Sequence, residues 1–394
     1  MKSLFGLPKK VLFCEKCVLS NQRPSSTVEF KNLKTRKIIG TDFVNSKICG
    51  SCSYQDIKEK INWKKRENEL KKILDKYRRK TGYDVVVPSS GGKDSAYTAH
   101  ILKYKYNMNP LTVTWSPHKY TDIGFKNFEN FINIGGLDNI LFSPNGKLHR
   151  YLTQISFLNL LHPFQPFIIG QKIIGPLIAK KFNINLVVYG ESPAEREGVE
   201  GNKMPDMSSK FFSTNSLRDI RLGGMNVKKI INQTNFKENE FQSYIPLTKK
   251  DVSKLKFIFL GYFHYWDLQE NYYYAAKNTG FKPNTERTEG SYSKYSSIDD
   301  CIDYMHYYTT FIKFGLGRAS YDAAQEIVNK KITREEGVAL VQKYDGEFPK
   351  KYFNVFLEYI GINEKSFFKT INKFRSPHLW KKTKGIWELR NKIS

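Results

Sequence analysis

Short apolar segments alternate with amphipathic ones between residues 81 and about 190. Apolar segments of strand length stand at 83–90, 110–116, 139–143 and 184–192. The residues between them repeat apolar positions at the spacing typical of helices. This alternation predicts an α/β fold, a parallel sheet with helices on both faces, whose ligands bind at the carboxyl ends of the strands.

Changes in composition along the chain predict four regions. The first holds two cysteine pairs and few periodic apolar positions, as in a small loop-rich module, and the second is a connecting helix with a basic outer side. The third is the α/β region, which continues through a polar stretch at 193–255, expected to form long loops, to a last predicted strand at 256–263. The fourth is mostly helical. The predicted regions are 1–60, 61–80, 81–265 and 266–394.

Composition narrows the class of protein. The chain has 394 residues, 40% of them hydrophobic, which is enough for a well-buried core. The net charge is +26, but lysine is spread through the whole chain, so the charge alone does not indicate a nucleic-acid partner. The apolar runs are short and the N-terminal segment lacks the pattern of a signal peptide. We therefore expect a cytoplasmic protein without a membrane span.

The segment SSGGKDS at 89–95 joins the first predicted strand to a helix. Gly91 and Gly92 let the backbone of this turn approach a ligand closely, and the helix N-terminus adds backbone N–H groups and positive potential. Such a turn suits a phosphate chain. It is not the Walker pattern G-x-x-x-x-G-K-[ST], which does not occur in the chain.

Side chains of the same turn add hydrogen-bond donors and charge. The hydroxyls of Ser90 and Ser95 can donate to phosphate oxygens. Lys93 adds a positive charge, and Asp94 can cap the helix or help to hold Mg²⁺. The pattern S-G-G-x-D-S resembles the signature of the PP-loop ATP pyrophosphatases, which have a HUP-like fold. This resemblance implies that ATP is cleaved between its α and β phosphates and that AMP passes to a carbonyl or carboxylate oxygen.

The ends of two further predicted strands would border such a nucleotide. They contribute Thr114 and Trp115 on one strand and Gly190 and Glu191 on the other. The Glu191 carboxylate is a candidate for binding Mg²⁺ or for proton transfer, and as a loop carboxylate it can equally face water.

Four of the five cysteines lie in the first 52 residues. Cys14, Cys17, Cys49 and Cys52 form two C-x₂-C pairs with 31 residues between them. The pattern predicts a zinc-ribbon-like module in which four thiolates hold one structural Zn²⁺. An iron–sulfur cluster and metal-free thiols are the alternatives. Cys301, on a predicted helix, is expected to be a packed core thiol.

A polar stripe marks a predicted helix in the segment SIDDCIDYMHYYTTFIKFGLGRAS. The stripe can line a catalytic cleft, and it can equally be a solvent face. It consists of Asp299, Asp303, His306, Thr310 and Lys313. Within it, His306 and Lys313 are candidate catalytic residues. Arg318 follows at a glycine-flanked helix end, where its guanidinium can hold phosphate in a bidentate fork.

A set of segments spread from about residue 12 to 350 resembles the N-acetyl sugar amidotransferases, PP-loop enzymes of bacterial surface-glycan biosynthesis that include the pseudaminic acid acetamidino synthases. The segments are CEKCVLSNQRP, CGSC, SSGGKDS, WSPHKYTDIGFKNFENF, GGLDNILFSPNGKLHR, PFQPFIIGQK, YGESPAE, DDCIDYMHYYTTFIKFGLGRAS and ITREEGVALVQKYDGEFP. The family pattern has Gly-Glu-Asn after the fourth predicted strand. This chain has Gly190-Glu191-Ser192 there, so serine replaces the asparagine.

This resemblance implies a reaction in the biosynthesis of lipopolysaccharide or of flagellin glycans. ATP would adenylylate the carbonyl oxygen of an N-acetyl group on a sugar, and ammonia would displace AMP to give an acetamidino group. No cysteine directly follows Met1, and none further on stands in a Cys-His-Glu setting. We therefore expect the ammonia to come from a separate glutamine amidotransferase subunit, or to be taken up free.

Two other functions compete with this one. A tRNA-modifying PP-loop enzyme of the thiolation type would use the positive charge and the cysteine pairs. Such enzymes commonly use a cysteine pair beyond the loop, where only Cys301 lies in this chain. The other alternative is a non-catalytic ATP-binding or assembly protein carried on the zinc module.

Overall fold

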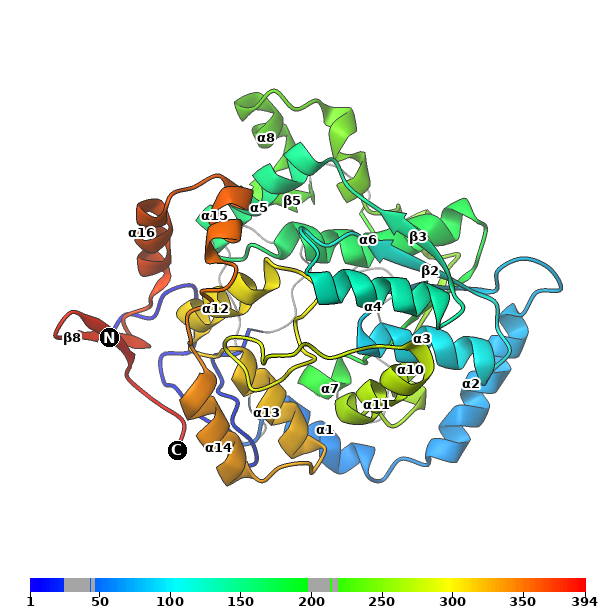
Figure 1. The fold of residues 1–394 in the computed structure, drawn as a ribbon, viewed down its shortest axis with the longest axis horizontal. Coiled ribbons are helices and arrows are strands. Elements are labelled where there is room, and N and C mark those ends of the chain that lie inside the picture. The colour runs from blue at the N-terminus through cyan, green and yellow to red at the C-terminus, as the bar shows by residue number, and fades with distance from the viewer. Residues whose placement is uncertain (25–42, 44–46, 198–212, 215–218) are drawn as a thin grey trace.

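The computed structural model describes residues 1–24, 43, 47–197, 213–214 and 219–394. Its centre is a five-stranded sheet in the order β3-β2-β1-β4-β7, with every neighbouring pair parallel (Figure 1). The strands are β1 (Val85–Pro88), β2 (Pro110–Trp115), β3 (Asp138–Phe142), β4 (Leu186–Tyr189) and β7 (Lys256–Phe259). The predicted α/β class with a parallel sheet is confirmed.

The central strands are apolar on both faces because helices cover both sides of the sheet. In β1, Val85 and Val87 pack into the cluster on one face and Val86 into the cluster on the other, and all three have no exposed surface. One face carries α2 (Trp63–Tyr77), α3 (Lys93–Tyr104) and α11 (Leu268–Thr279), and the opposite face carries α5 (Gly146–Leu160) and α6 (Gln165–Lys181).

The order of the strands creates a crevice at the carboxyl ends of the central strands β1 and β4. From β1 the chain moves outward to β2 and β3, whereas β4 and β7 lie on the other side of β1. The connections after β1 and β4 therefore leave the sheet in opposite directions, and ligands of open α/β sheets bind at such a switch point. The segment 89–95, which we call the glycine loop, follows β1 directly and leads into α3.

The polar stretch 193–255, expected to form long loops, contains short elements where the structure describes it. They are α7 (Ala194–Glu197), β5 (Arg221–Leu222), β6 (Met225–Asn226), α8 (Val227–Gln233), a 3₁₀ helix (Glu238–Tyr244) and α9 (Lys249–Val252). Residues 198–212 and 215–218 of this stretch lie outside the described residues. The strand expected at 256–263 ends at Phe259, because 260–263 form helix α10 (Leu260–Phe263).

The chain after α11 is mostly helical and ends in a hairpin. Its elements are α12 (Asp303–Phe314), α13 (Arg318–Val328), α14 (Arg334–Tyr344), α15 (Phe353–Ile360), α16 (Glu364–Phe374), β8 (Trp380–Thr383) and β9 (Ile386–Leu389). The hairpin is not among the predicted elements. Its turn places Lys384 and Gly385 at φ angles of 49° and 86°, the left-handed conformations of a two-residue hairpin loop.

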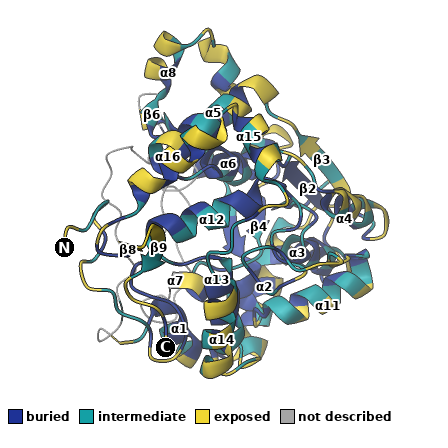
Figure 2. Ribbon diagram, turned by 60° about the vertical axis from the view of Figure 1, so that its left-hand side comes forward, coloured by how far each residue is buried: buried dark blue, intermediate teal, exposed yellow. Residues whose placement is uncertain are grey.

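Helix α12 differs from the predicted helix at its start. It begins at Asp303, so Asp299 and Cys301 precede the helix and do not lie on it. Residues 303–314 are all buried or half-buried, so the predicted polar stripe is not a solvent face (Figure 2). Cys301 is 4% exposed, and its thiol donates to the carbonyl oxygen of Tyr120 at 3.6 Å, as expected of a packed thiol.

The N-terminal segment packs against the C-terminal helices. The four paired cysteines share an apolar cluster with residues of α13 and α14. The division into four regions stays a prediction, and its first region includes residues 25–42 and 44–46, which the structure does not describe. None of the helices in the described ranges is long and apolar enough to cross a membrane.

Candidate active site

The glycine loop is shaped by the backbone of a neighbouring helix. Gly91 has a φ of +81°, and a Cβ atom there would lie 2.8 Å from the Cα of Phe128 on α4 (Asp122–Asn133). Only glycine combines this φ angle with so close a contact. Gly92 then serves as the N-cap of α3. The first N–H groups of α3 have no partner within the helix, so they are available to an anion at this end.

Hydrogen bonds within the loop hold its two serines. The Gly92 N–H donates to the Ser90 hydroxyl at 3.3 Å, and the Ser90 N–H donates to the Ser95 hydroxyl at 3.3 Å. The Ser95 hydroxyl donates to the Gly92 carbonyl oxygen at 3.0 Å. These bonds preform the loop without a ligand. Direct donation from Ser90 and Ser95 to phosphate stays a prediction.

Asp94 has a partner for each of its carboxylate oxygens. The Lys93 ammonium lies 2.5 Å from Oδ2, and the Asn271 side chain on α11 donates to Oδ1 at 3.1 Å. The Lys93 side chain is only 9% exposed. The charge of Lys93 is therefore held at the loop, and Asp94 is tied to both α3 and α11.

A cavity of about 240 Å³ opens over the glycine loop. One wall consists of residues 90–95, and the facing wall comes from the C-terminal part of the chain. The facing wall includes Phe281, Tyr295, Asp299 and Arg318. Arg318 therefore lines the cavity over the loop, with its Nε 3.0 Å from a carboxylate oxygen of Asp322 and its guanidinium 4.5 Å from the centroid of the Tyr307 ring. Its predicted contact with phosphate stays a prediction.

Asp299 is a site residue that the sequence pattern misplaces. Its backbone carbonyl accepts from the Thr121 N–H at 3.2 Å, and a Cβ at Gly124 would lie 2.5 Å from its Cα. Burial, followed by the charges of Asp303 and Asp300, raises the pKa of Asp299 to about 7, against a hydrogen bond from Ser90 that lowers it. No sequence signal places it here, because its position depends on a contact between segments far apart in the chain.

A second cavity of about 250 Å³ lies between the ends of β1, β2 and β4 and helix α6. It shares Ser90 and Ser95 with the first cavity, so the two meet at the loop. Trp115 and Tyr189 line it. Ser89 Oγ and Trp115 Nε1 are buried there without a hydrogen-bond partner among the described residues. The two cavities thus share part of their lining, and the second has buried polar atoms that are free to bind a ligand.

Two further predicted residues at the strand ends, Thr114 and Gly190, pack against neighbouring elements. The Thr114 hydroxyl is buried and accepts from the Asn139 side chain at 2.9 Å. A Cβ at Gly190 would lie 2.8 Å from the hydroxyl oxygen of Thr98 on α3, so glycine lets β4 approach that helix. Both residues pack the floor of the crevice and are absent from the walls of the two cavities.

Glu191 lies beside the site and is paired. Its Oε2 is 2.6 Å from the guanidinium of Arg196, while its Oε1 is buried without a partner among the described residues. Glu191 is not on the walls of either cavity. Its predicted roles in Mg²⁺ binding and proton transfer stay predictions.

His306 and Lys313 lie outside both cavities. The His306 ring stacks on Phe164 with 4.9 Å between centroids, and its Nδ1 is 3.1 Å from an oxygen of Asp303. The Lys313 ammonium donates to the carbonyl oxygen of Leu160, at the end of α5, at 2.6 Å. His306 and Lys313 thus contact groups outside the two cavities, and their predicted catalytic roles stay predictions.

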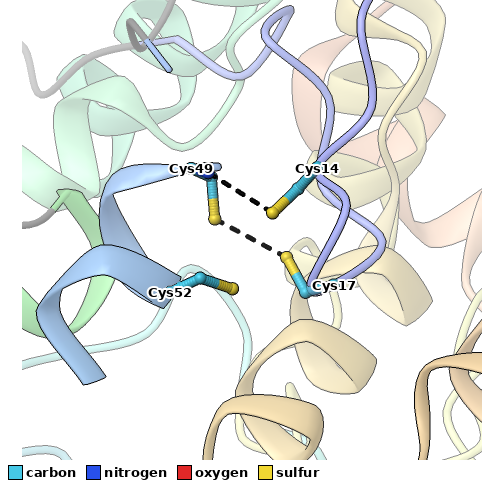
Figure 3. Close-up of side chains that lie close together, drawn as sticks. All are labelled: Cys14, Cys17, Cys49 and Cys52. Atoms are coloured by element: carbon cyan, nitrogen blue, oxygen red, sulfur yellow. Dashed lines mark hydrogen bonds between the residues drawn. The ribbon is translucent and has the colours of Figure 1, made fainter. Parts of the chain in front are cut away.

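The four paired cysteines form a compact cluster (Figure 3). All four Sγ atoms lie within 4.8 Å of one another, and the Sγ atoms of Cys17 and Cys49 are 3.6 Å apart. Tetrahedral zinc with Zn–S bonds of about 2.3 Å would separate sulfur atoms by about 3.8 Å, so the cluster fits such an ion. The prediction that these cysteines can hold a metal is confirmed, and the identity of the metal stays a prediction.

The cysteine cluster is linked to the walls of the candidate active site. It packs on Ala323, Ala324 and Val328 of α13, the helix whose first residue is Arg318. On its other side, Lys58 of α1 (Gly50–Lys58) forms a buried ion pair with Glu195 at 3.0 Å. A metal here would therefore hold both α13 and the segment after β4 in place.

The fold and the site together define an α/β protein with a preformed glycine loop at the switch point of a parallel sheet. A family model described as "LPS biosynthesis protein WbpG-like, C-terminal domain" matches residues 289–394, which include Asp299 and Arg318. An uncharacterized protein of Methanocaldococcus jannaschii is 36% identical over 81 residues. That match covers 20% of this chain and 28% of the relative, so the chain spans little more than a quarter of it.

Proposed function

We propose that the chain is an ATP-dependent amidotransferase of bacterial glycan biosynthesis, with the HUP-like fold of the PP-loop enzymes. One observation carries this proposal: the glycine loop lies at the switch point of the sheet, with a cavity on each side. The match of residues 289–394 to a domain of lipopolysaccharide biosynthesis supports the pathway class. In this proposal the substrate is an N-acetylated sugar, either a nonulosonic acid or a nucleotide sugar.

The proposed nucleotide lies across both cavities. The adenosine occupies the cavity of Trp115 and Tyr189, and the β and γ phosphates occupy the cavity of the glycine loop. Lys93 and Arg318 place positive charge beside the phosphates, and the first N–H groups of α3 point toward them. Mg²⁺ would neutralise part of the phosphate charge when it is bound.

The proposed chemistry has two steps. The amide oxygen of the N-acetyl group attacks the α phosphorus, the bond to the β-phosphate oxygen breaks, and pyrophosphate leaves. Ammonia then attacks the acyl carbon, and its C–N bond replaces the C–O bond to AMP, with loss of one proton. An amide is a poor electrophile, so converting its oxygen into a phosphate leaving group is the step that requires the loop. The ammonia comes from a separate glutaminase subunit or from solution.

The test is a product analysis with defined sugars. The purified chain is incubated with Mg²⁺, ATP and ammonium, together with each of several N-acetylated nonulosonic acids and nucleotide sugars. We expect AMP and pyrophosphate to form only with an accepted sugar, whose product is lighter by the mass difference between an oxygen atom and an NH group. Lys93→Met, which removes charge at the loop, should slow both products together. Absence of sugar-dependent pyrophosphate release across the panel would contradict the proposal.

The competing tRNA thiolation function finds less support. Cys301 is the one cysteine beyond the loop, and its thiol is buried in a hydrogen bond to the Tyr120 carbonyl. Burial and the neighbouring Asp300 raise the pKa of Cys301 to about 11, which disfavours the nucleophilic thiolate. The four other cysteines are gathered in the cysteine cluster.

A further inference from the structure

A carboxylate faces the glycine loop across the proposed phosphate cavity. Asp299 and the loop residues Ser90 to Ser95 line the same space, and the Ser90 hydroxyl makes a hydrogen bond to the Asp299 carboxylate. Asp299 forms no ion pair with any described residue, and the nearest charges acting on it are those of Asp303 and Asp300. A bound polyphosphate would therefore share the cavity with the Asp299 carboxyl group, and its negative charge would further disfavour the ionised form of that group.

The two cations of the cavity offset this repulsion only in part, because each already has a carboxylate partner. Lys93 is paired with Asp94 at 2.5 Å, and Arg318 is paired with Asp322 at 3.0 Å. A divalent cation between Asp299 and the phosphates would relieve it. Mg²⁺ is held in proteins by one or two carboxylates together with phosphate oxygens of the substrate, which is the set of ligands that this cavity would offer.

Asp94, the sequence-based candidate for Mg²⁺, is less available than Asp299. Both of its oxygens are engaged, one by Lys93 and the other by Asn271. A metal would therefore compete with these two partners for the carboxylate oxygens. Asp299 accepts hydrogen bonds from its own backbone N–H and from the Ser90 hydroxyl, and it has no ion-pair partner among the described residues.

The backbone around Asp299 is held rigidly, as a metal ligand requires. The Thr121 N–H donates to the Asp299 carbonyl oxygen, and the Cα of Asp299 touches Gly124. The next residue, Asp300, accepts from the His118 N–H at 2.8 Å and lies 2.7 Å from the His118 ring nitrogen Nδ1. These contacts join the segment 298–301 to the chain that follows β2.

We propose that Asp299 is a ligand of the divalent cation that accompanies the nucleotide phosphates in this cavity. The proposal rests on the proposed function, since it assumes that the cavity binds ATP. It gives the C-terminal part of the chain a role in the nucleotide site: that part supplies the metal ligand, while the sheet supplies the loop.

The test separates metal binding from nucleotide binding. The full chain is titrated by calorimetry with an ATP analogue that has a methylene group between the α and β phosphates, once with EDTA and once with Mn²⁺. Bound Mn²⁺ is followed separately by electron paramagnetic resonance. The variants are Asp299→Asn, Asp299→Ser and, as a charge-matched control on the exposed side of α2, Asp75→Asn. Thermal unfolding establishes that each variant is folded.

We expect Mn²⁺ to tighten analogue binding in the wild-type chain and in Asp75→Asn. In Asp299→Asn and Asp299→Ser the gain from Mn²⁺ should fall by about tenfold or more, because loss even of a supporting group typically costs a metal site that much. Binding in EDTA should stay the same or improve, since a repelling charge has been removed. An unchanged gain from Mn²⁺ in a folded Asp299 variant would overturn the proposal while leaving ATP binding intact. A wild-type chain that binds no analogue in either buffer would overturn the proposed function as well.

Discussion

A Cβ atom on Gly91 would lie 2.8 Å from the Cα of Phe128, so the glycine loop and helix α4 are in backbone contact. Helix α4 also carries Gly124, which touches Asp299. One helix therefore sets the position of the loop and of the carboxylate that faces it. The site depends on backbone-to-backbone distances that side-chain motion cannot adjust.

The first prediction concerns Gly91→Ala. A matched control is Gly82→Ala, because Gly82 has nearly the same φ, +79°, but nothing within 4 Å of its Cβ position. Gly82→Ala should lose about 1–2 kcal/mol of unfolding free energy, the cost of a left-handed backbone. Gly91→Ala should lose about 1–3 kcal/mol more from the clash, and its nucleotide affinity should fall. Denaturant titration and calorimetry measure both. Equal losses in the two variants would show that the contact with Phe128 is adaptable.

The second prediction concerns the cysteine cluster. Cys14→Ser should abolish the bound metal, measured by elemental analysis of the purified chain, because one thiolate of a tetrahedral site is lost. Cys301→Ser, a change of the same kind outside the cluster, should keep it. Metal-free chain should also bind pyrophosphate more weakly, since the cluster packs on α13, which carries Arg318. Equal metal contents in Cys14→Ser and the wild type would contradict the tetrathiolate site.

The third prediction separates Lys313 from Arg318. Lys313→Met keeps the apolar stem but leaves the Leu160 carbonyl without its donor, which should cost about 1–3 kcal/mol of unfolding free energy. Arg318→Met should instead lower the affinity for inorganic pyrophosphate, measured by calorimetry, because Arg318 lines the cavity over the loop. If Lys313→Met had normal stability but no longer bound pyrophosphate, the prediction would be contradicted, and Lys313 would be a phosphate-binding residue.

The fourth prediction is a dependence of stability on pH. His149 is 3% exposed, and burial, followed by the charge of His118, lowers its pKa well below the ordinary value. The folded chain keeps His149 neutral, whereas the unfolded chain binds a proton below a pH of about 6.5. Its contribution is therefore complete above that pH and is lost as the pH falls, by about 1.4 kcal/mol per pH unit.

Comparison with His149→Gln isolates this contribution, because the other histidines titrate in both proteins. Chemical unfolding across the range from neutral to mildly acidic pH should show a steeper loss of stability in the wild type than in His149→Gln. The variant retains a polar group that can meet the Tyr244 hydroxyl, which lies 2.6 Å from His149 Nδ1 in the wild type. Parallel curves would show that His149 takes up its proton in the folded chain.

Local sequence determined the elements of the sheet and two sites with short sequence motifs, the glycine loop and the paired cysteines. The run Val85–Val87 is apolar at every position, which suits a strand buried on both faces, and β1 forms there. The loop after it needs glycine for a positive φ at Gly91, so the pattern reveals the turn. The cysteine pairs could be recognised because two-residue spacing is itself the geometry of metal binding.

Tertiary structure decided where the charged residues of the C-terminal part lie. Helical spacing extends the helix back to Asp299, yet the Asp300 carboxylate accepts from the Ile302 N–H at 2.8 Å and holds His118, so a turn forms and α12 starts later. In the sequence, Lys313 stands on a stripe that can line a cleft or face solvent, but in the folded chain its ammonium donates to the Leu160 carbonyl oxygen at the end of α5. Both outcomes depend on partners more than 150 residues away, whose approach is set by packing and has no periodicity in the chain. The sequence by itself therefore determined strands, loop and cysteine site, and only the folded chain placed Asp299 opposite the loop.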